Sequence, residues 1–432
     1  MVSSPPPPLS PAFCNHPFRR AVRQRGLLLV AVTAAFFPWV SFNLNELDTQ
    51  PWFLLLAALY LLLTANHLQR RYGTVWLFMF GVGGLLAILH QGDAIQTIRG
   101  VATYISAGFA VLVFARYMQV GIETRRRMLV VVNICWLLYP LLQFAGMDEI
   151  APLVVARTTE NRGFTSLAPE PTFYGIFSLS MIAVLMLERE QWRLHLGRPT
   201  RTFGILIWLN VFQIILVAQS SMAILLLFLI SMVGAVLYRP KAAAGVLLAI
   251  LLSGYLLLGV LDPDVLSETA SRPLQLAGML LDEPKLILVL DQSINERFSA
   301  VYISIAESVG DFLLPHGLFA FETVSEKYAR ASPIVNSAQG NKIMSFVGSF
   351  LYELGAVSLL YFYVVGRALS NLPGFRGKVF WAVALGCTLL TAVPVGFPMV
   401  GYVIALLEAK RSPRRRRQRV EVAVQPLTPT IC

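Results

Sequence analysis

The stretch NRGFTSLAPEPTFYGIFSLSMIAVLML, residues 161–187, joins a polar, proline-containing segment to a run of apolar residues. Runs of about 20 apolar residues are typical of helices that cross a membrane. The chain repeats this pattern along its 432 residues, of which 56% are hydrophobic and only 14% are charged. Soluble proteins have about 25% charged residues. We therefore predict an all-α, multi-pass membrane protein.

The apolar runs predict a polytopic bundle of about 12 transmembrane spans. Their expected positions are residues 26–42, 51–67, 72–90, 100–119, 128–146, 172–187, 203–218, 222–238, 242–261, 345–366, 379–393 and 395–408. The last apolar block, 379–408, is too long for one upright helix. Pro394 and Pro398 bracket a break within it, so we expect two short spans folded as a hairpin.

The distribution of charge predicts how the spans are oriented. The net charge is +11, which by itself would suggest nucleic-acid binding. If the N-terminus is cytoplasmic and the spans alternate, most Lys and Arg fall in cytoplasmic segments and most Asp and Glu fall outside. This is the positive-inside pattern. The basic excess therefore sets topology, with both termini cytoplasmic. We expect membrane lipids but no nucleic acid among the partners.

The topology divides the chain into five regions. They are a disordered, Pro-rich and basic N-terminus at 1–25, spans one to nine at 26–261 with an outer motif loop at 147–171, a large outer loop at 262–344, the final spans at 345–408 and a basic cytoplasmic tail at 409–432. The first span is expected to be a retained anchor. The positions of the four cysteines suggest neither a disulfide nor a metal site.

Charged side chains at the predicted outer surface are the candidate binding and catalytic groups. Arg157 and Arg162 belong to the motif loop, and Arg297 belongs to the large loop. Guanidinium groups suit bidentate binding of the oxygens of a phosphate or carboxylate. Glu170 lies between two prolines where the sixth span begins. Its carboxylate is a candidate base for a sugar hydroxyl, or the counter-ion of an arginine.

The large loop contains a predicted helix and a candidate histidine. Ser293 and Glu296 form a capping-box pattern that opens SINERFSAVYISIAESVGDFL, residues 293–313, in which apolar residues recur at helical spacing. His316 follows in a turn, where an imidazole can exchange a proton near neutral pH. Glu353 is the only acid well inside a span. It is expected to face a cavity or to reach the outer surface.

Each of these groups also has a structural interpretation. The alternatives are an ordinary loop arginine at Arg157, a structural ion pair of Arg162 with Glu170, a solvated Arg297 paired with Glu296 or Asp311, and an ordinary loop histidine at His316.

Two short stretches resemble the superfamily of bacterial polysaccharide (O-antigen and exopolysaccharide) polymerases and O-antigen ligases. The stretch RGFTSLAPEPTFYG is similar to the family signature Arg–Gly…Glu–Pro–Ser/Thr…Gly. The matching residues are Arg162, Gly163, Glu170, Pro171, Thr172 and Gly175. The stretch FVGSFLYELGAVSLLYF resembles the family segment that follows the large loop. Its matching residues are Glu353, Gly355 and Ala356.

The resemblance implies a fold like that of C-type membrane glycosyltransferases, in a bacterial cytoplasmic (inner) membrane. A polymerase of this family moves a growing glycan from undecaprenyl diphosphate onto the next lipid-linked repeat unit at the outer leaflet. The resemblance implies no cofactor and no essential metal. It makes Glu170 and His316 the candidate catalytic residues, and Arg157, Arg162 and Arg297 the groups that bind diphosphate. Gly163, Pro171, Gly175 and Glu353 are supporting residues in this interpretation, and a chain-length regulator and a flippase are candidate partners.

Other functions stay open at this point. A ligase would transfer the glycan to another acceptor, but His316 is followed by Gly317, whereas ligases commonly have Asn, Ser or Gln there. Lys327 also stands where the family's first spaced glycine would fall. A transporter or flippase would predict internal repeats and mid-membrane charges, which the sequence does not suggest. A scaffold in an export complex would make Arg162, Glu170 and Arg297 dispensable.

Overall fold

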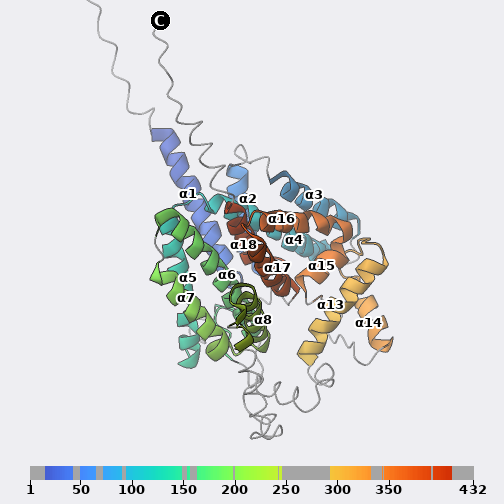
Figure 1. The fold of residues 1–432 in the computed structure, drawn as a ribbon. Coiled ribbons are helices and arrows are strands. Elements are labelled where there is room, and N and C mark those ends of the chain that lie inside the picture. Colours follow the sequence, from blue (N-terminus) through green and yellow to red (C-terminus); the bar gives the residue numbers. More distant parts are fainter. Residues whose placement is uncertain are drawn as a thin grey trace, which may run out of the picture.

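Every secondary-structure element in the described part of the chain is a helix (Figure 1). The computed structural model describes residues 15–41, 49–64, 72–89, 94–147, 153–155, 163–197, 200–241, 243–245, 292–331, 343, 345–390 and 393–410. The predicted all-α class is confirmed for these residues. In chain order the helices are α1 (Asn15–Phe36), α2 (Trp52–Leu63), α3 (Gly73–Ile88), α4 (Ala94–Tyr117), α5 (Ile122–Phe144), α6 (Pro171–Leu196), α7 (Arg201–Phe212), η3 (Gln213–Ala218), α8 (Ser221–Tyr238), α13 (Gln292–Gly310), α14 (Phe321–Ala331), α15 (Phe346–Leu354), η4 (Gly355–Val357), α16 (Ser358–Ser370), α17 (Phe375–Leu390) and α18 (Met399–Ala409).

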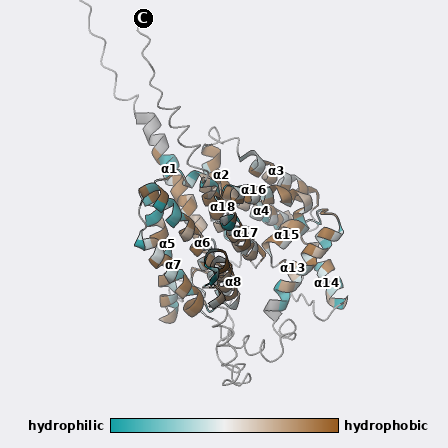
Figure 2. Cartoon of the chain, viewed as in Figure 1, coloured by the Kyte–Doolittle hydropathy of each residue, from teal (hydrophilic) through white to brown (hydrophobic). Residues whose placement is uncertain are grey.

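Six helical segments of the described chain are long and apolar enough to cross a membrane. They are α4, α5, α6, α7 with η3, α8, and the segment from α15 to α16. Three shorter apolar helices are α2, α3 and α18. Hydrophobic residues cover most of the helices, and hydrophilic ones gather on α13 and α14 and at one end of α5 and α6 (Figure 2). The chain is therefore a multi-pass helical membrane protein. The full count of about 12 spans stays a prediction, because most of 242–261 lies outside the described residues.

The centre of the bundle is α18, which packs against α4, α6 and α16. Its side chains from Met399 to Leu407 are buried. The ring of Tyr402 stacks on Phe114 with the centroids 4.4 Å apart. A side chain at Gly401 would collide with the α4 backbone at Ala110. Close approach of backbones at small residues is how helices gain packing energy where lipid replaces water.

A buried ion pair joins four segments at one end of the bundle. The Arg125 guanidinium donates from Nε to Glu188 Oε1 at 2.8 Å and from Nη2 to Glu188 Oε2 at 3.1 Å. Nη2 also donates to Gln191, and Nη1 donates to two backbone carbonyls of the α4–α5 turn. The Tyr402 hydroxyl donates to Glu188 Oε1 at 2.8 Å. We call this group, Arg125, Glu188, Gln191 and Tyr402, the node.

Further contacts lie at the same end of the bundle as the node and at the opposite end. The node end also holds the ion pairs of Arg367 with Glu408 and of Lys410 with Glu190. At the opposite end, Gly317 packs on the backbone of Leu89, and Gly396 packs on Thr103. We call this opposite end the motif end, because residues 163–170 lie there. Which end faces the cytoplasm stays a prediction.

The structure differs from two local expectations. The span expected at 345–366 is broken, because α15 ends at Leu354 and Gly355 has a φ of +53°. In α13 the predicted apolar series does not form the buried face. Phe298 and Val309 are exposed, whereas Ala300, Ile303 and the serines Ser299, Ser304 and Ser308 are buried. Small serines bring α13 close to α15, where a side chain at Gly348 would collide with the Ser304 hydroxyl.

Candidate active site at the motif end

Backbone contacts with η3 hold the start of the motif loop. The Phe164 amide donates to Val217 O at 3.0 Å. A side chain at Gly163 would collide with the backbone of Val217 and Ala218. These acceptors belong to η3, a π-helical turn that ends at Gln219, whose φ is +46°. π-Helical turns are frequent at functional sites because they disrupt the regular backbone hydrogen bonds of a helix.

Polar side chains of α5 fix the middle of the loop. Gln143 donates from Nε2 to Thr165 Oγ1 at 2.7 Å and accepts from the Ser166 amide at 2.9 Å. The Ser166 hydroxyl donates to Trp136 O at 2.8 Å. Ser166 is fully buried and adopts a φ of +53°, which side-chain-bearing residues rarely do. The loop is therefore held in one conformation by its neighbours rather than by its own preferences.

This loop delivers Glu170 to the N-terminus of α6. Glu170 has an extended backbone and is the N-cap residue, and Pro171 occupies the first helical turn, where its missing N–H costs nothing. The Glu170 carboxylate does not cap the helix, is half-buried and has no hydrogen bond or ion pair with another described residue. One turn later, Gly175 packs on Ser220 and Ala223 of the α7–α8 hairpin. Gly163 and Gly175 thus both serve close backbone approach.

The predicted arginines are only partly described. Arg157 and Arg162 lie outside the described residues, so their predicted pairing with Glu170 is not addressed. Arg297 lies on α13 and is half-buried. No hydrogen bond or ion pair among the described residues joins Glu170 to His316 or Glu353. The structure therefore does not bring the two candidate bases into contact.

His316 and Glu353 instead belong to one junction between the large loop and α15. The His316 and Gly317 amides donate to Tyr352 O and Glu353 O, at 3.0 and 3.2 Å. The imidazole stacks on the Tyr352 ring with the centroids 4.2 Å apart. The Ala356 amide returns a bond to Leu313 O at 2.8 Å. Gly355 allows this crossing, since a side chain there would collide with the backbone at Leu313 and Pro315.

The carboxylate of Glu353 has a partner that the sequence did not suggest. The Tyr104 hydroxyl donates to Glu353 Oε2 at 2.5 Å. Tyr104 lies on α4, 249 residues away in sequence, and is buried. Local sequence patterns carry no signal for such a pair. Glu353 therefore points toward α4 in the bundle interior, and of the two expected orientations the cavity-facing one stays a prediction.

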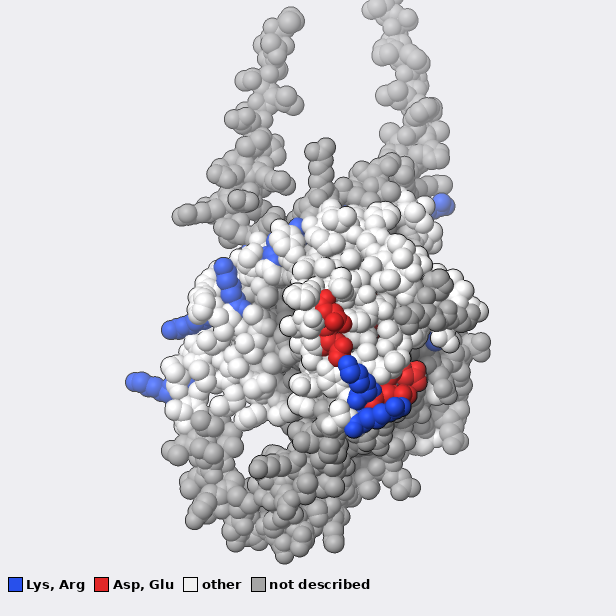
Figure 3. All heavy atoms as spheres, turned by 90° about the vertical axis from the view of Figure 1, so that its right-hand side faces the viewer, with Lys and Arg blue, Asp and Glu red and all other residues white. Residues whose placement is uncertain are grey.

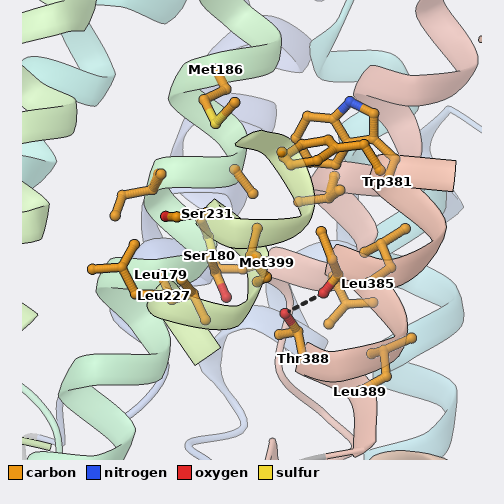
Figure 4. Close-up of a pocket in the computed structure, with 18 of the residues that line it drawn as sticks. Leu179, Ser180, Met186, Leu227, Ser231, Trp381, Leu385, Thr388, Leu389 and Met399 are labelled. Carbon is orange, nitrogen blue, oxygen red and sulfur yellow. Dashed lines mark hydrogen bonds between the residues drawn. The ribbon is translucent and has the colours of Figure 1, made fainter. Parts of the chain in front are cut away.

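An apolar groove runs along α6 from Leu179 to Glu190 (Figure 4). Its volume is about 500 Å³, and its walls come from α6, α8, α17 and the start of α18. The wall residues labelled in Figure 4 are Leu179, Ser180, Met186, Leu227, Ser231, Trp381, Leu385, Thr388, Leu389 and Met399. The Thr388 hydroxyl is satisfied by Ala384 O at 2.7 Å, so the lining offers few open polar groups. Such a groove suits a hydrocarbon chain.

Neither a protein-family model nor a curated protein matches this chain. Its function is therefore inferred from the sequence motifs and the geometry above.

Proposed function

We propose that this protein is a polysaccharide polymerase, which transfers a growing glycan from undecaprenyl diphosphate to a lipid-linked repeat unit at the outer leaflet. The observation that carries the proposal is the arrangement of α6. This single helix presents the Glu170 carboxylate at its N-terminus and lines the apolar groove from Leu179 onward. Nine residues separate the two positions, or roughly 14 Å of helix at 1.5 Å per residue. A lipid-linked sugar has the same order of parts, a polar head above a hydrocarbon tail.

The reaction needs a base, a stabilised leaving group and limited access of water. In the proposed step, the acceptor hydroxyl oxygen forms a bond to the anomeric carbon while the bond from that carbon to the diphosphate oxygen breaks. Glu170 takes the hydroxyl proton, and the electron pair leaves with undecaprenyl diphosphate. Arg157, Arg162 and Arg297 are proposed to stabilise the negative charge of this leaving group. The proton count balances without a metal, a nucleotide or an oxidant.

The rigid backbone around Glu170 supports a catalytic rather than a solvating role. A base acts efficiently only when it is held within hydrogen-bond distance of the proton it removes. The loop that leads to Glu170 is fixed by η3 and by Gln143, so the backbone from which this carboxylate extends has a defined position. The carboxylate is also left without a partner among the described residues, as a base that must accept a proton requires. His316, by contrast, is already hydrogen-bonded on both ring nitrogens.

Glu170→Gln is expected to abolish long glycan chains while leaving the protein abundant in the membrane. The amide keeps the size of the side chain but cannot accept the proton, and loss of a general base costs roughly 10²–10⁴-fold in rate. The measurement is glycan profiling of cells whose only copy carries the change, with Glu322→Gln on the exposed face of α14 as the matched control. Retention of single repeat units supports polymerisation. Long chains that stay on the carrier lipid would indicate a ligase. A normal glycan would contradict the role of Glu170 and favour a scaffold or a transporter.

Ser231→Trp is expected to reduce transfer by filling the groove with an indole. Ser231 lies on α8 and lines the groove. Leu225→Trp is the matched control, because Leu225 is an exposed residue of the same helix that does not line the groove. Crosslinking of a photoreactive polyprenyl diphosphate to the purified protein should fall in Ser231→Trp and stay unchanged in Leu225→Trp. Equal crosslinking in both variants would remove the groove from the proposal.

A further inference from the structure

Three potential metal ligands converge where α13 ends. Glu307, Asp311 and His316 each offer one ligand atom, and these atoms all lie within 4.8 Å of one another. Glu307 and Asp311 are one helical turn apart, and the Asp311 amide donates to Glu307 O at 2.9 Å. Zinc-type ions bind imidazole nitrogen and carboxylate oxygen at about 2.0–2.2 Å, so ligand atoms in a tetrahedral site lie about 3.4 Å apart. The three atoms would have to approach one another by up to about 1.4 Å to share one ion.

The hydrogen bonds of the imidazole determine which ring nitrogen faces the carboxylates. His316 Nδ1 lies 3.2 Å from the carbonyl oxygen of Tyr352. A carbonyl can only accept, so Nδ1 carries the hydrogen. Nε2 lies 2.8 Å from Asp311 Oδ2, so it is the ring nitrogen that faces the two carboxylates. A proton on Nε2, or a metal ion bound by both groups, satisfies this contact.

The surroundings of the three ligands are those of a metal site. Metal-binding histidines commonly donate their other ring N–H to a backbone carbonyl, as His316 does to Tyr352. Carboxylate ligands are commonly hydrogen-bonded in turn. The Tyr328 hydroxyl of α14 hydrogen-bonds Glu307, and this bond raises the pKa of Tyr328 to about 12. Stacking on Tyr352 fixes the plane of the imidazole.

We propose that Glu307, Asp311 and His316 bind one divalent cation of the zinc type at the motif end. One nitrogen and two oxygen ligands suit Zn²⁺ better than Ca²⁺ or Mg²⁺, which prefer oxygen alone. Three protein ligands leave a fourth position of the tetrahedron for water. The acidic residues visible on the described part of this face gather in one group together with basic ones, whereas other Lys and Arg stand apart from it (Figure 3). The site goes beyond the proposed transfer reaction, which needs no metal.

The cation would connect α13 to the loop segment that is bonded to α15. Glu307 belongs to α13, whereas His316 is bonded to the backbone of α15. The ion therefore clamps the loop helix to the junction that carries Glu353. Its expected effect is to stabilise the fold of the large loop, in addition to any effect on transfer.

Cobalt titration of the full-length protein tests the site directly. The protein is purified in detergent without a histidine tag, stripped with chelator and titrated with Co²⁺, which gives visible absorption bands in tetrahedral sites. We expect one Co²⁺ per chain, displaced by Zn²⁺. His316→Ala, Asp311→Asn and Glu307→Gln should each weaken Co²⁺ binding by about 100-fold or more, and Tyr328→Phe by about 10-fold.

Two controls keep this result interpretable. His195→Ala removes a histidine on α6 and Glu322→Gln removes an acid on α14, and both should bind Co²⁺ like the wild type. Each variant must elute as a single species from size-exclusion chromatography. If a ligand variant misfolds, Tyr328→Phe still tests the site, because it retains all three ligands. Absence of visible bands in the wild type, or equal Co²⁺ affinity in all variants, would overturn the proposal. In that case His316 is an imidazolium paired with Asp311.

Discussion

Replacing Arg125 by alanine is expected to destabilise the bundle by about 3–5 kcal/mol, the usual cost of leaving one partner of a buried ion pair alone. Only 4% of the Arg125 side chain and none of the Glu188 side chain is exposed. All five N–H groups of the guanidinium are used, because Nε makes one hydrogen bond while Nη1 and Nη2 make two each. The change removes the hydrogen-bond donors of Glu188 and of two backbone carbonyls at once. Thermal unfolding in detergent, followed by size-exclusion chromatography, measures the loss.

Arg127→Ala is the matched control for this prediction. Arg127 lies two residues away on α5, is 76% exposed and pairs with Glu123 at the surface, where ion pairs contribute little. Arg125→Lys should also be destabilising, since an ammonium group has three donors and no planar fork. Removing both charges with Arg125→Met and Glu188→Leu should recover part of the stability. Equal effects of Arg125→Ala and Arg127→Ala would contradict a structural role for the node.

Gly355→Ala is expected to disrupt the junction between α15 and the large loop, at a cost of roughly 2–5 kcal/mol. Two penalties add at this position. The backbone has a φ of +53° and a ψ of −131°, which residues with a Cβ rarely adopt. The added methyl group would also collide with the rigid backbone at Leu313 and Pro315. The loop segment around His316 should detach, so limited proteolysis between α13 and α15 should become faster.

Gly366→Ala provides the comparison, because Gly366 lies in α16 with nothing within 4 Å of its added Cβ. Alanine favours a helix over glycine, so this variant should be as stable as the wild type or slightly more so. If Gly355→Ala leaves the cleavage rate and the thermal midpoint unchanged, the contacts at Gly355 do not attach the segment around His316 to α15.

The helical membrane class could be predicted from the sequence because it depends on composition and on the length of apolar runs. Local geometry was less accessible. The break at Gly355 interrupts an apolar run that looks continuous, since η4 is formed from residues as apolar as those of α16. The buried face of α13 was missed for a related reason. The sequence pattern marks Phe298 and Val309, but the buried face combines Ala300 and Ile303 with small serines that allow close packing against α15.

The candidate site was predictable where it is local and not where it is assembled from distant segments. The motif residues from Gly163 to Gly175 follow each other in the chain. Both glycines lie at close contacts, Gly163 with the backbone of η3 and Gly175 with the side chains of Ser220 and Ala223. The hydrogen bonds from Tyr104 to Glu353 and from Tyr328 to Glu307 join different helices, so no spacing in the sequence predicts them. The catalytic roles of Glu170 and His316 and the binding roles of Arg157, Arg162 and Arg297 stay predictions.

The π-helical turn before α8 also has a consequence for the order of biogenesis. The Phe164 amide is bound by the carbonyl of Val217, which the ribosome delivers later. Chains are synthesised and inserted from the N-terminus, so the motif loop and α6 enter the membrane before their acceptor exists. The loop can reach its final conformation only after α7 and η3 have arrived. A ribosome-stalled chain that ends before η3 would thus carry every residue of the motif and still lack its shape, which delays the maturation of Glu170 until the following hairpin is in place.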